Sequence, residues 1–77
     1  MHTHRYTLDL DARPDVLPRV VNLVRRRGCE IVSLQFAQGD CHRPGRLELA
    51  VRVDERHARP MAHWLGALVD VRSVAEV

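Results

Sequence analysis

The sequence predicts an α+β fold in which two helices alternate with four strands in the order β-α-β-β-α-β. Three observations predict this class. Residues 4–11 and 46–54 alternate apolar and polar side chains, as half-buried strands do. Residues 15–27 and 54–68 repeat apolar side chains at helical spacing. The turn-forming segment GDCHRPG at 39–45 indicates a hairpin between the two middle strands.

The first strand is predicted over 4–11, and its apolar face consists of Tyr6, Leu8 and Leu10. A helix follows with Asp15 as its N-cap. Pro18 then falls at the third helical position, where its missing N–H removes no helical hydrogen bond. The predicted apolar stripe of this helix is Leu17, Val20, Val21 and Val24.

The first helix has clear signals for its end. The three arginines 25–27 lie beside the negative end of the helix dipole, which favours cations. Gly28 supplies the left-handed residue that commonly follows a helix. The apolar period then changes, and residues 31–36 are predicted to form the second strand.

The third strand, 46–54, has an expected core face and an expected outer face. The core face is Leu47, Leu49, Val51 and Val53, and the outer face is Arg46, Glu48, Ala50 and Arg52. The last strand is predicted over 69–77, with Val71 and Val74 as its strongest apolar positions.

The second helix is predicted to have Asp54 as its N-cap and to end near Leu68. Its apolar face is Met61, Trp64, Leu65 and Leu68. Pro60 disfavours a regular helix here, because an interior proline costs a helix about 3 kcal/mol. We therefore expect an irregular first turn, with regular helix starting near Ala58.

Two such split β-α-β units give a ferredoxin-like domain, a four-stranded antiparallel sheet with both helices on one face. Right-handed crossovers favour the strand order 4-1-3-2. The edges of such a sheet are usually covered or paired with another chain. Since a domain of this size buries only about 60% of its unfolded surface, self-association is expected.

Composition limits the partners and the cellular location. The net charge of +2 is carried by arginine alone and is too small to indicate nucleic acid. No apolar run is long enough to span a membrane, and the first residues lack the apolar segment of a secretion signal, so a cytoplasmic location is expected. In that compartment Cys29 and Cys41 are predicted to be free thiols.

Three other functional interpretations are disfavoured. The arginines at 25–27 could bind RNA, but RNA-binding sheets of this fold stack bases on exposed aromatics, and Tyr6 and Trp64 fall on predicted core faces. A solvated helix end is favoured for these arginines, with partner docking as an intermediate option. Asp9 and Asp11 share a strand face but have no nucleophile beside them, so they are not expected to be catalytic. A metal site is not expected either, because the candidate ligands lack zinc spacing. These ligands are His2, His4, Cys29, Cys41, His42, His57 and His63.

An ordered set of motifs resembles the ACT domain, and within it the short, single-domain small subunit of acetolactate synthase. The set comprises Arg13-Pro14 with Val16-Leu17, the segment 23–28 (LVRRRG), Ile31 with Ser33-Leu34, Leu47-Glu48-Leu49, and the closing segment 68–71 (LVDV). The similarity covers about residues 5–74 in one register. It implies that residues 1–77 form a single ACT-like domain.

The resemblance also implies a function. Small subunits of this family are non-catalytic, hold no cofactor and form homodimers through a sheet edge and a helix. They bind and activate a catalytic large subunit, which carries thiamine diphosphate, magnesium and FAD, in branched-chain amino acid biosynthesis. In valine-sensitive members, a small amino-acid effector binds between paired ACT domains. Neither nucleic acid nor a membrane is implied as a partner.

The effector-loop positions carried over from the family are Ala12, Arg13, Pro14, Asp15, Val16, Leu17, Glu30 and Ile31. Three of them depart from the family pattern, which has asparagine, glycine and asparagine where this chain has Ala12, Asp15 and Glu30. Asp15 would cap the helix N–H groups itself and repel the carboxylate of an amino acid. The sequence therefore predicts weak or no valine feedback. The alternative function is a free-standing ACT-domain sensor of a small molecule such as an amino acid, which regulates another enzyme.

Overall fold

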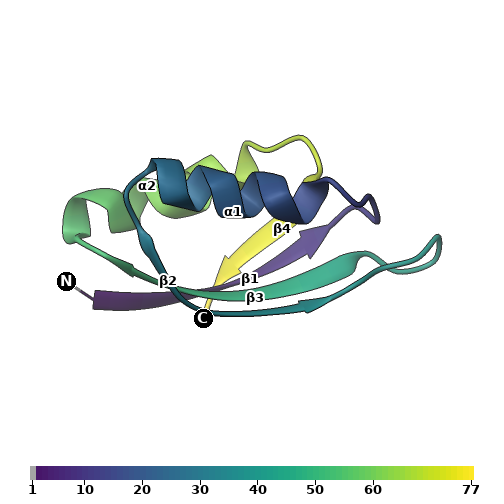
Figure 1. Cartoon of the computed structure of the whole chain (residues 1–77), viewed down its shortest axis with the longest axis horizontal. Coiled ribbons are helices and arrows are strands. Elements are labelled where there is room, and N and C mark those ends of the chain that lie inside the picture. The colour runs from purple at the N-terminus through teal and green to yellow at the C-terminus, as the bar shows by residue number, and fades with distance from the viewer. Residues whose placement is uncertain (1) are drawn as a thin grey trace.

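A computed structural model describes residues 2–77 and shows two helices packed on one face of a four-stranded sheet (Figure 1). The elements are β1 (His2–Leu10), α1 (Val16–Arg26), β2 (Glu30–Ala37), β3 (Gly45–Val53), α2 (Glu55–Gly66) and β4 (Val71–Glu76). The sheet is antiparallel with the order β2-β3-β1-β4, which is the predicted order read from the other edge. The predicted ferredoxin-like fold is therefore confirmed.

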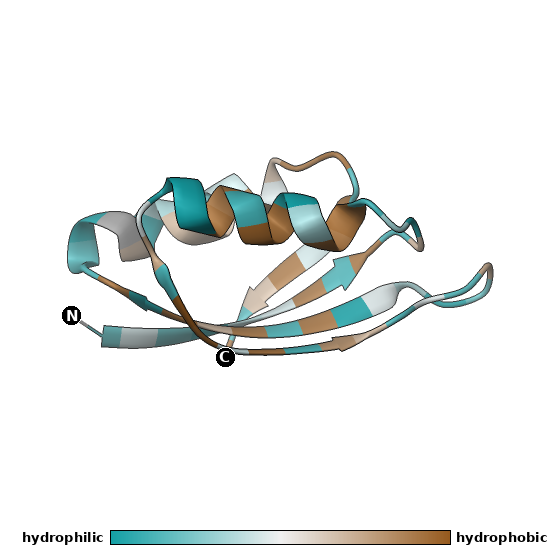
Figure 2. Cartoon of the chain, in the orientation of Figure 1, coloured by the Kyte–Doolittle hydropathy of each residue, from teal (hydrophilic) through white to brown (hydrophobic). Residues whose placement is uncertain are grey.

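The core lies between the sheet and the helices, where the inward faces of β1 and β3 meet the apolar sides of α1 and α2. Brown apolar bands alternate with polar ones along these elements in Figure 2. The predicted core faces of both central strands are confirmed, since every member is at most 2% exposed. These residues are Tyr6, Leu8 and Leu10 on β1, and Leu47, Leu49, Val51 and Val53 on β3. Full burial of one such aliphatic side chain stabilises the fold by about 1.5–3 kcal/mol.

The buried stripe of α1 is rotated relative to the prediction. Its buried residues are Val16, Val20, Leu23 and Val24. Leu17 and Val21, which were expected in the stripe, are only half-buried. Which side of a helix is buried depends on how it packs against the rest of the fold, and the spacing within one helix contains no information on that packing.

Three further predictions are corrected. α2 has no irregular first turn: it begins at Glu55 and runs through Pro60. Pro60 leaves only the carbonyl of Arg56 without its helical donor, and Arg56 is exposed to water. Ala50 lies on the outer face of β3 as predicted but is 2% exposed, because its small side chain lies between the strands that flank β3. Val69 belongs to the turn before β4 and is 92% exposed.

Gly28 ends α1 in the left-handed conformation that the sequence predicts, with φ of 76°. A Cβ atom at this position would meet nothing within 4 Å, so the only cost of a larger residue is backbone strain. We expect Gly28→Ala to lower the free energy of unfolding by about 1–2 kcal/mol. Urea denaturation measures this change. A change below about 0.3 kcal/mol would show that the turn relaxes to another conformation.

Candidate functional site

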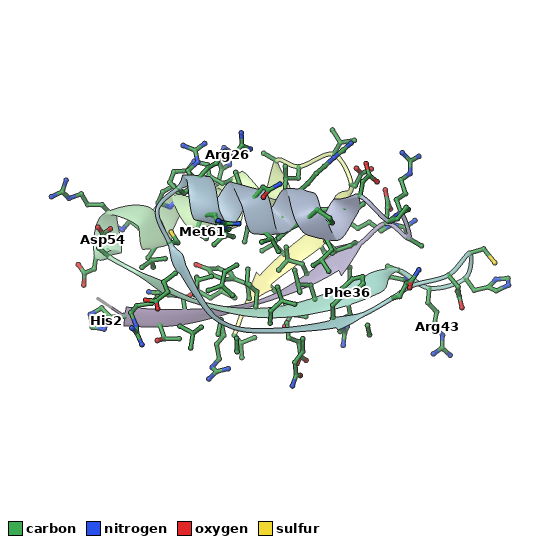
Figure 3. The ribbon with its side chains drawn as sticks, in the orientation of Figure 1. His2, Arg26, Phe36, Arg43, Asp54 and Met61 are labelled. Atoms are coloured by element: carbon green, nitrogen blue, oxygen red, sulfur yellow. The ribbon has the colours of Figure 1, made fainter. Side chains whose placement is uncertain are left out.

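The candidate effector site is a pocket at the start of α1. It lies between the loop after β1, the first turn of α1 and the end of β2, and its volume is about 290 Å³. Its lining residues are Asp11, Ala12, Arg13, Pro14, Leu17, Pro18, Phe36, Gln38 and Gly39. Figure 3 shows Phe36 at the end of the sheet where α1 begins. The pocket combines an apolar wall with one exposed guanidinium group, that of Arg13.

Backbone and side-chain bonds fasten the pocket loop to the segment before β4. The Asp11 N–H donates to the carbonyl of Asp70 at 2.9 Å, and the Arg13 N–H donates to the carbonyl of Asp11 at 2.8 Å. The side chain of Arg72 donates to the carboxylate of Asp11. These bonds fix the shape of the loop.

A charge network behind the loop is centred on Asp70, whose residue is 7% exposed. Arg19 donates from Nη1 to its carboxylate at 2.9 Å, while Nη1 of Arg13 lies 4.0 Å from it. Nη2 of Arg19 lies 2.8 Å from the carboxylate of Asp15. A buried carboxylate is stable only when a cation or a hydrogen-bond donor pairs with it, so the Asp70 carboxylate needs the guanidinium of Arg19.

Asp15 is the N-cap residue, as predicted, but its side chain makes no capping hydrogen bond. The expectation that Asp15 would satisfy the helix N–H groups is wrong. Its carboxylate turns outward to Arg19, one helical turn away, because the guanidinium is a stronger partner than a neutral amide. The negative charge at the helix start is thereby partly neutralised.

The structure brings together only four of the eight predicted site residues. Ala12, Arg13, Pro14 and Leu17 line the pocket. Asp15 faces Arg19, and Val16 is 2% exposed in the core.

Glu30 and Ile31 lie at the other end of β2 from the pocket. Phe36 lies six positions along the strand from Glu30, which corresponds to about 20 Å. Glu30 lies 3.3 Å from Nη1 of Arg52 on β3, and Ile31 is half-buried. Within one chain, Glu30 and Ile31 therefore cannot contact a ligand in the pocket.

Phe36 and Gln38 were missed as site residues. Phe36 lies within the predicted strand and Gln38 just after it, and nothing local distinguishes Phe36 from a core residue. The missing information is that β2 is an edge strand: Phe36 pairs with the core residue Leu47 but remains 39% exposed, because no strand within residues 2–77 lies beyond β2.

The β2 edge exposes more apolar surface than any other strand. Val32 and Leu34 are 48% and 36% exposed, and Ile31 is the only residue of the strand that is even half-buried. A register shift in the pairing with β3 falls at Val32. An apolar edge strand of this kind offers unpaired backbone groups to another strand.

The other residues considered for catalysis or metal binding do not form a site among the residues that the structure describes. Asp9 lies 3.7 Å from Nε of Arg46 and accepts a hydrogen bond from Ser73, so it links neighbouring strands. Both cysteines are free, and burial raises the pKa of the Cys29 thiol, which makes it a poor nucleophile. Among the described residues, no three His, Cys, Asp or Glu side chains gather as metal ligands; the side chain of His57 lies outside that description.

Within residues 2–77, neither helix is long and apolar enough to cross a membrane. No protein-family model and no curated protein matches the sequence.

Solved structures are similar over almost the whole chain. The acetolactate synthase small subunit of Thermotoga maritima matches 99% of this chain with a TM-score of 0.84 and 25% identity. The chain spans 47% of the length of that subunit. The ACT domain of a GTP pyrophosphokinase from Chlorobium tepidum matches 97% of this chain and 96% of its own length, with a TM-score of 0.82 and 9% identity. The chain therefore has the βαββαβ fold of an ACT domain.

Proposed function

We propose that the chain is a non-catalytic accessory subunit that binds and activates the catalytic subunit of an acetolactate synthase. The observation that carries the proposal is the similarity to the acetolactate synthase small subunit of T. maritima, which covers 99% of the chain at 25% identity. The described residues add support, since the candidate pocket contains no nucleophile and its Asp11 is paired with Arg72. Such a pocket suits binding rather than bond making.

The proposed active form is a homodimer in which two β2 edges pair and α1 lies beside the seam. The apolar side chains that β2 exposes would be buried in that arrangement. An antiparallel two-fold pair also sets the start of one β2 against the end of the other. Glu30 of the partner subunit would then lie near Phe36 and the pocket, which one chain alone does not achieve.

The pocket explains why valine feedback should be weak. Arg19 is already occupied by two carboxylates, Asp15 and Asp70, and Asp15 keeps negative charge beside the helix start. Of the two arginines near the pocket, only Arg13 is loosely held, since it lies 4.0 Å from Asp70. An amino-acid carboxylate would therefore find one weakly engaged cation and a nearby anion.

The test is the rate of acetolactate formation by a thiamine diphosphate-dependent catalytic subunit from the same genome, titrated with this chain. A saturable rise in rate supports the accessory function. The absence of both a rate change and co-elution in gel filtration would contradict it.

We expect valine to bind with a dissociation constant above 1 mM and to leave the activated rate within twofold. Isothermal titration of the chain and the activity assay measure the two effects. As a matched variant, Asp15→Gly removes the competing carboxylate and restores the glycine of the family loop. We expect that variant to bind valine at least tenfold more tightly. Micromolar binding by the unaltered chain would overturn the prediction.

A free-standing ACT-domain sensor remains the second candidate. The observation that favours it is that the pocket, with its apolar wall and Arg13, is complete within one chain. A thermal-shift screen of amino acids distinguishes the two functions. A ligand that raises the melting temperature, together with no effect on acetolactate formation, would favour the sensor.

A further inference from the structure

A second concave surface lies on the outer side of α1, away from the pocket. It is an open groove of about 720 Å³ between α1 and the connection from α2 to β4. Its lining residues are Arg19, Asn22, Arg25, Arg26 and Leu68, and we call it the arginine groove. None of these residues belongs to β2, the strand whose edge pairs in the proposed homodimer.

The three arginines 25–27 do not all serve the same purpose. The guanidinium of Arg27 lies 4.1 Å from the ring centroid of Trp64 and joins α1 to α2. The side chains of Arg25 and Arg26 are exposed and make no hydrogen bond or ion pair with any residue that the structure describes. Figure 3 shows Arg26 on the outer side of α1, directed away from the sheet.

The helix dipole explains only part of this arrangement. Cations in the last turn gain about 0.3–1 kcal/mol from the dipole. That interaction uses none of the five N–H donors of each guanidinium group. No acidic residue lines the groove, so the donors of Arg25 and Arg26 are free to meet carboxylates of another molecule.

An apolar contact adjoins the two free arginines. Leu68 is half-buried in the groove wall, and the next residue, Val69, is 92% exposed, the highest value among the large hydrophobic side chains described. Apolar residues bordered by arginine are typical of protein interfaces, where arginine is enriched and lysine is depleted.

We propose that the arginine groove is the surface on which the catalytic subunit docks, through an acidic segment that also carries an apolar side chain. Carboxylates of that segment pair with Arg25 and Arg26, and its apolar side chain covers Leu68 and Val69. This assignment rests on the proposed accessory function and specifies its contact surface. Charge complementarity selects a protein segment rich in Asp and Glu.

The experiment compares two double variants of the full chain in the acetolactate assay. Arg25→Glu/Arg26→Glu reverses the charge in the groove. Arg43→Glu/Arg59→Glu makes the same change in net charge at two exposed arginines on the hairpin loop and α2. We expect the groove variant to need at least tenfold more chain for half-maximal activation, with the saturated rate unchanged, and the control to stay within twofold of the unaltered chain.

A milder variant separates docking from folding, because glutamate near a helix C-terminus weakens the helix. Arg25→Gln/Arg26→Gln removes the charges without adding an acid to the helix end, and we expect at least a threefold shift in half-maximal concentration while circular dichroism shows that the chain stays folded. Equal shifts in groove and control variants, or none in either, would overturn the docking surface while leaving the accessory function intact. A lack of activation by the unaltered chain would instead overturn the accessory function and, with it, the partner assigned to the groove.

Discussion

Leu34→Lys is expected to convert the proposed homodimer into a monomer, with a dissociation constant at least 100-fold higher. Leu34 lies in the middle of the β2 edge and is 36% exposed in one chain. In a two-fold dimer each substitution acts twice. Each copy loses apolar burial and brings an ammonium group to the seam, at a cost of about 1.5 kcal/mol per copy. The two copies together account for the factor of 100, since 1.4 kcal/mol is tenfold.

The matched control is Val69→Lys, which makes the same kind of change at an apolar residue that is 92% exposed and far from β2 in the fold. Sedimentation equilibrium of the three proteins measures the dissociation constants. We expect the control to dimerise like the unaltered chain. Equal dissociation constants for all three would place the dimer contact elsewhere than the β2 edge. A monomeric unaltered chain at millimolar concentration would contradict the dimer itself.

The sequence was sufficient to predict the fold because most of its signals are local. Alternation along β1 and β3 identified every large apolar side chain that is buried on their core faces, and the left-handed Gly28 marked the end of α1. The strand order followed from the handedness of two crossovers. None of these inferences needed knowledge of how distant segments pack.

Two errors come from interactions that compete with the predicted ones. Pro60 was predicted to disturb α2, but the helix runs through it, and Met61 and Leu65, which follow it, are buried in the core. Asp15 was predicted to cap α1, but Arg19, four residues further along the chain, takes its carboxylate. Arg19 also binds Asp70, which is distant in the sequence, and the local pattern contains neither this contact nor the packing of Met61 and Leu65.

The site was harder to predict than the fold for the same reason. The loop residues Ala12 to Leu17 could be carried over from a motif, whereas Phe36 lines the pocket only because β2 lies at the edge. Asp70 is 58 residues from Ala12 and determines which arginine is free. The arginine groove likewise depends on Leu68 reaching α1 from the other end of the chain.

Tyr6→Phe is expected to raise the free energy of unfolding by about 1–3 kcal/mol at neutral pH. Tyr6 is 1% exposed, and its hydroxyl has no hydrogen-bond partner among the residues that the structure describes. Burying an unpaired hydroxyl costs about 1–3 kcal/mol, which phenylalanine avoids while keeping the ring in the core. Urea denaturation at pH 7 measures the change. A loss of stability would show that the hydroxyl makes a bond to water.

The same substitution should change how stability depends on alkaline pH. Burial, with smaller contributions from the charges of Glu76 and Cys29, raises the pKa of Tyr6 from 10.0 to about 12. Between these values the unfolded chain loses the phenolic proton while the folded chain retains it, so folding stability is full below pH 10 and falls as the pH rises towards 12. A pKa shift of this size corresponds to a loss of about 2–3 kcal/mol in the free energy of unfolding. We therefore expect the stability difference between Tyr6→Phe and the unaltered chain to widen by that amount from pH 9 to pH 12. Parallel stability curves would show that Tyr6 ionises as easily in the folded chain as in the unfolded one.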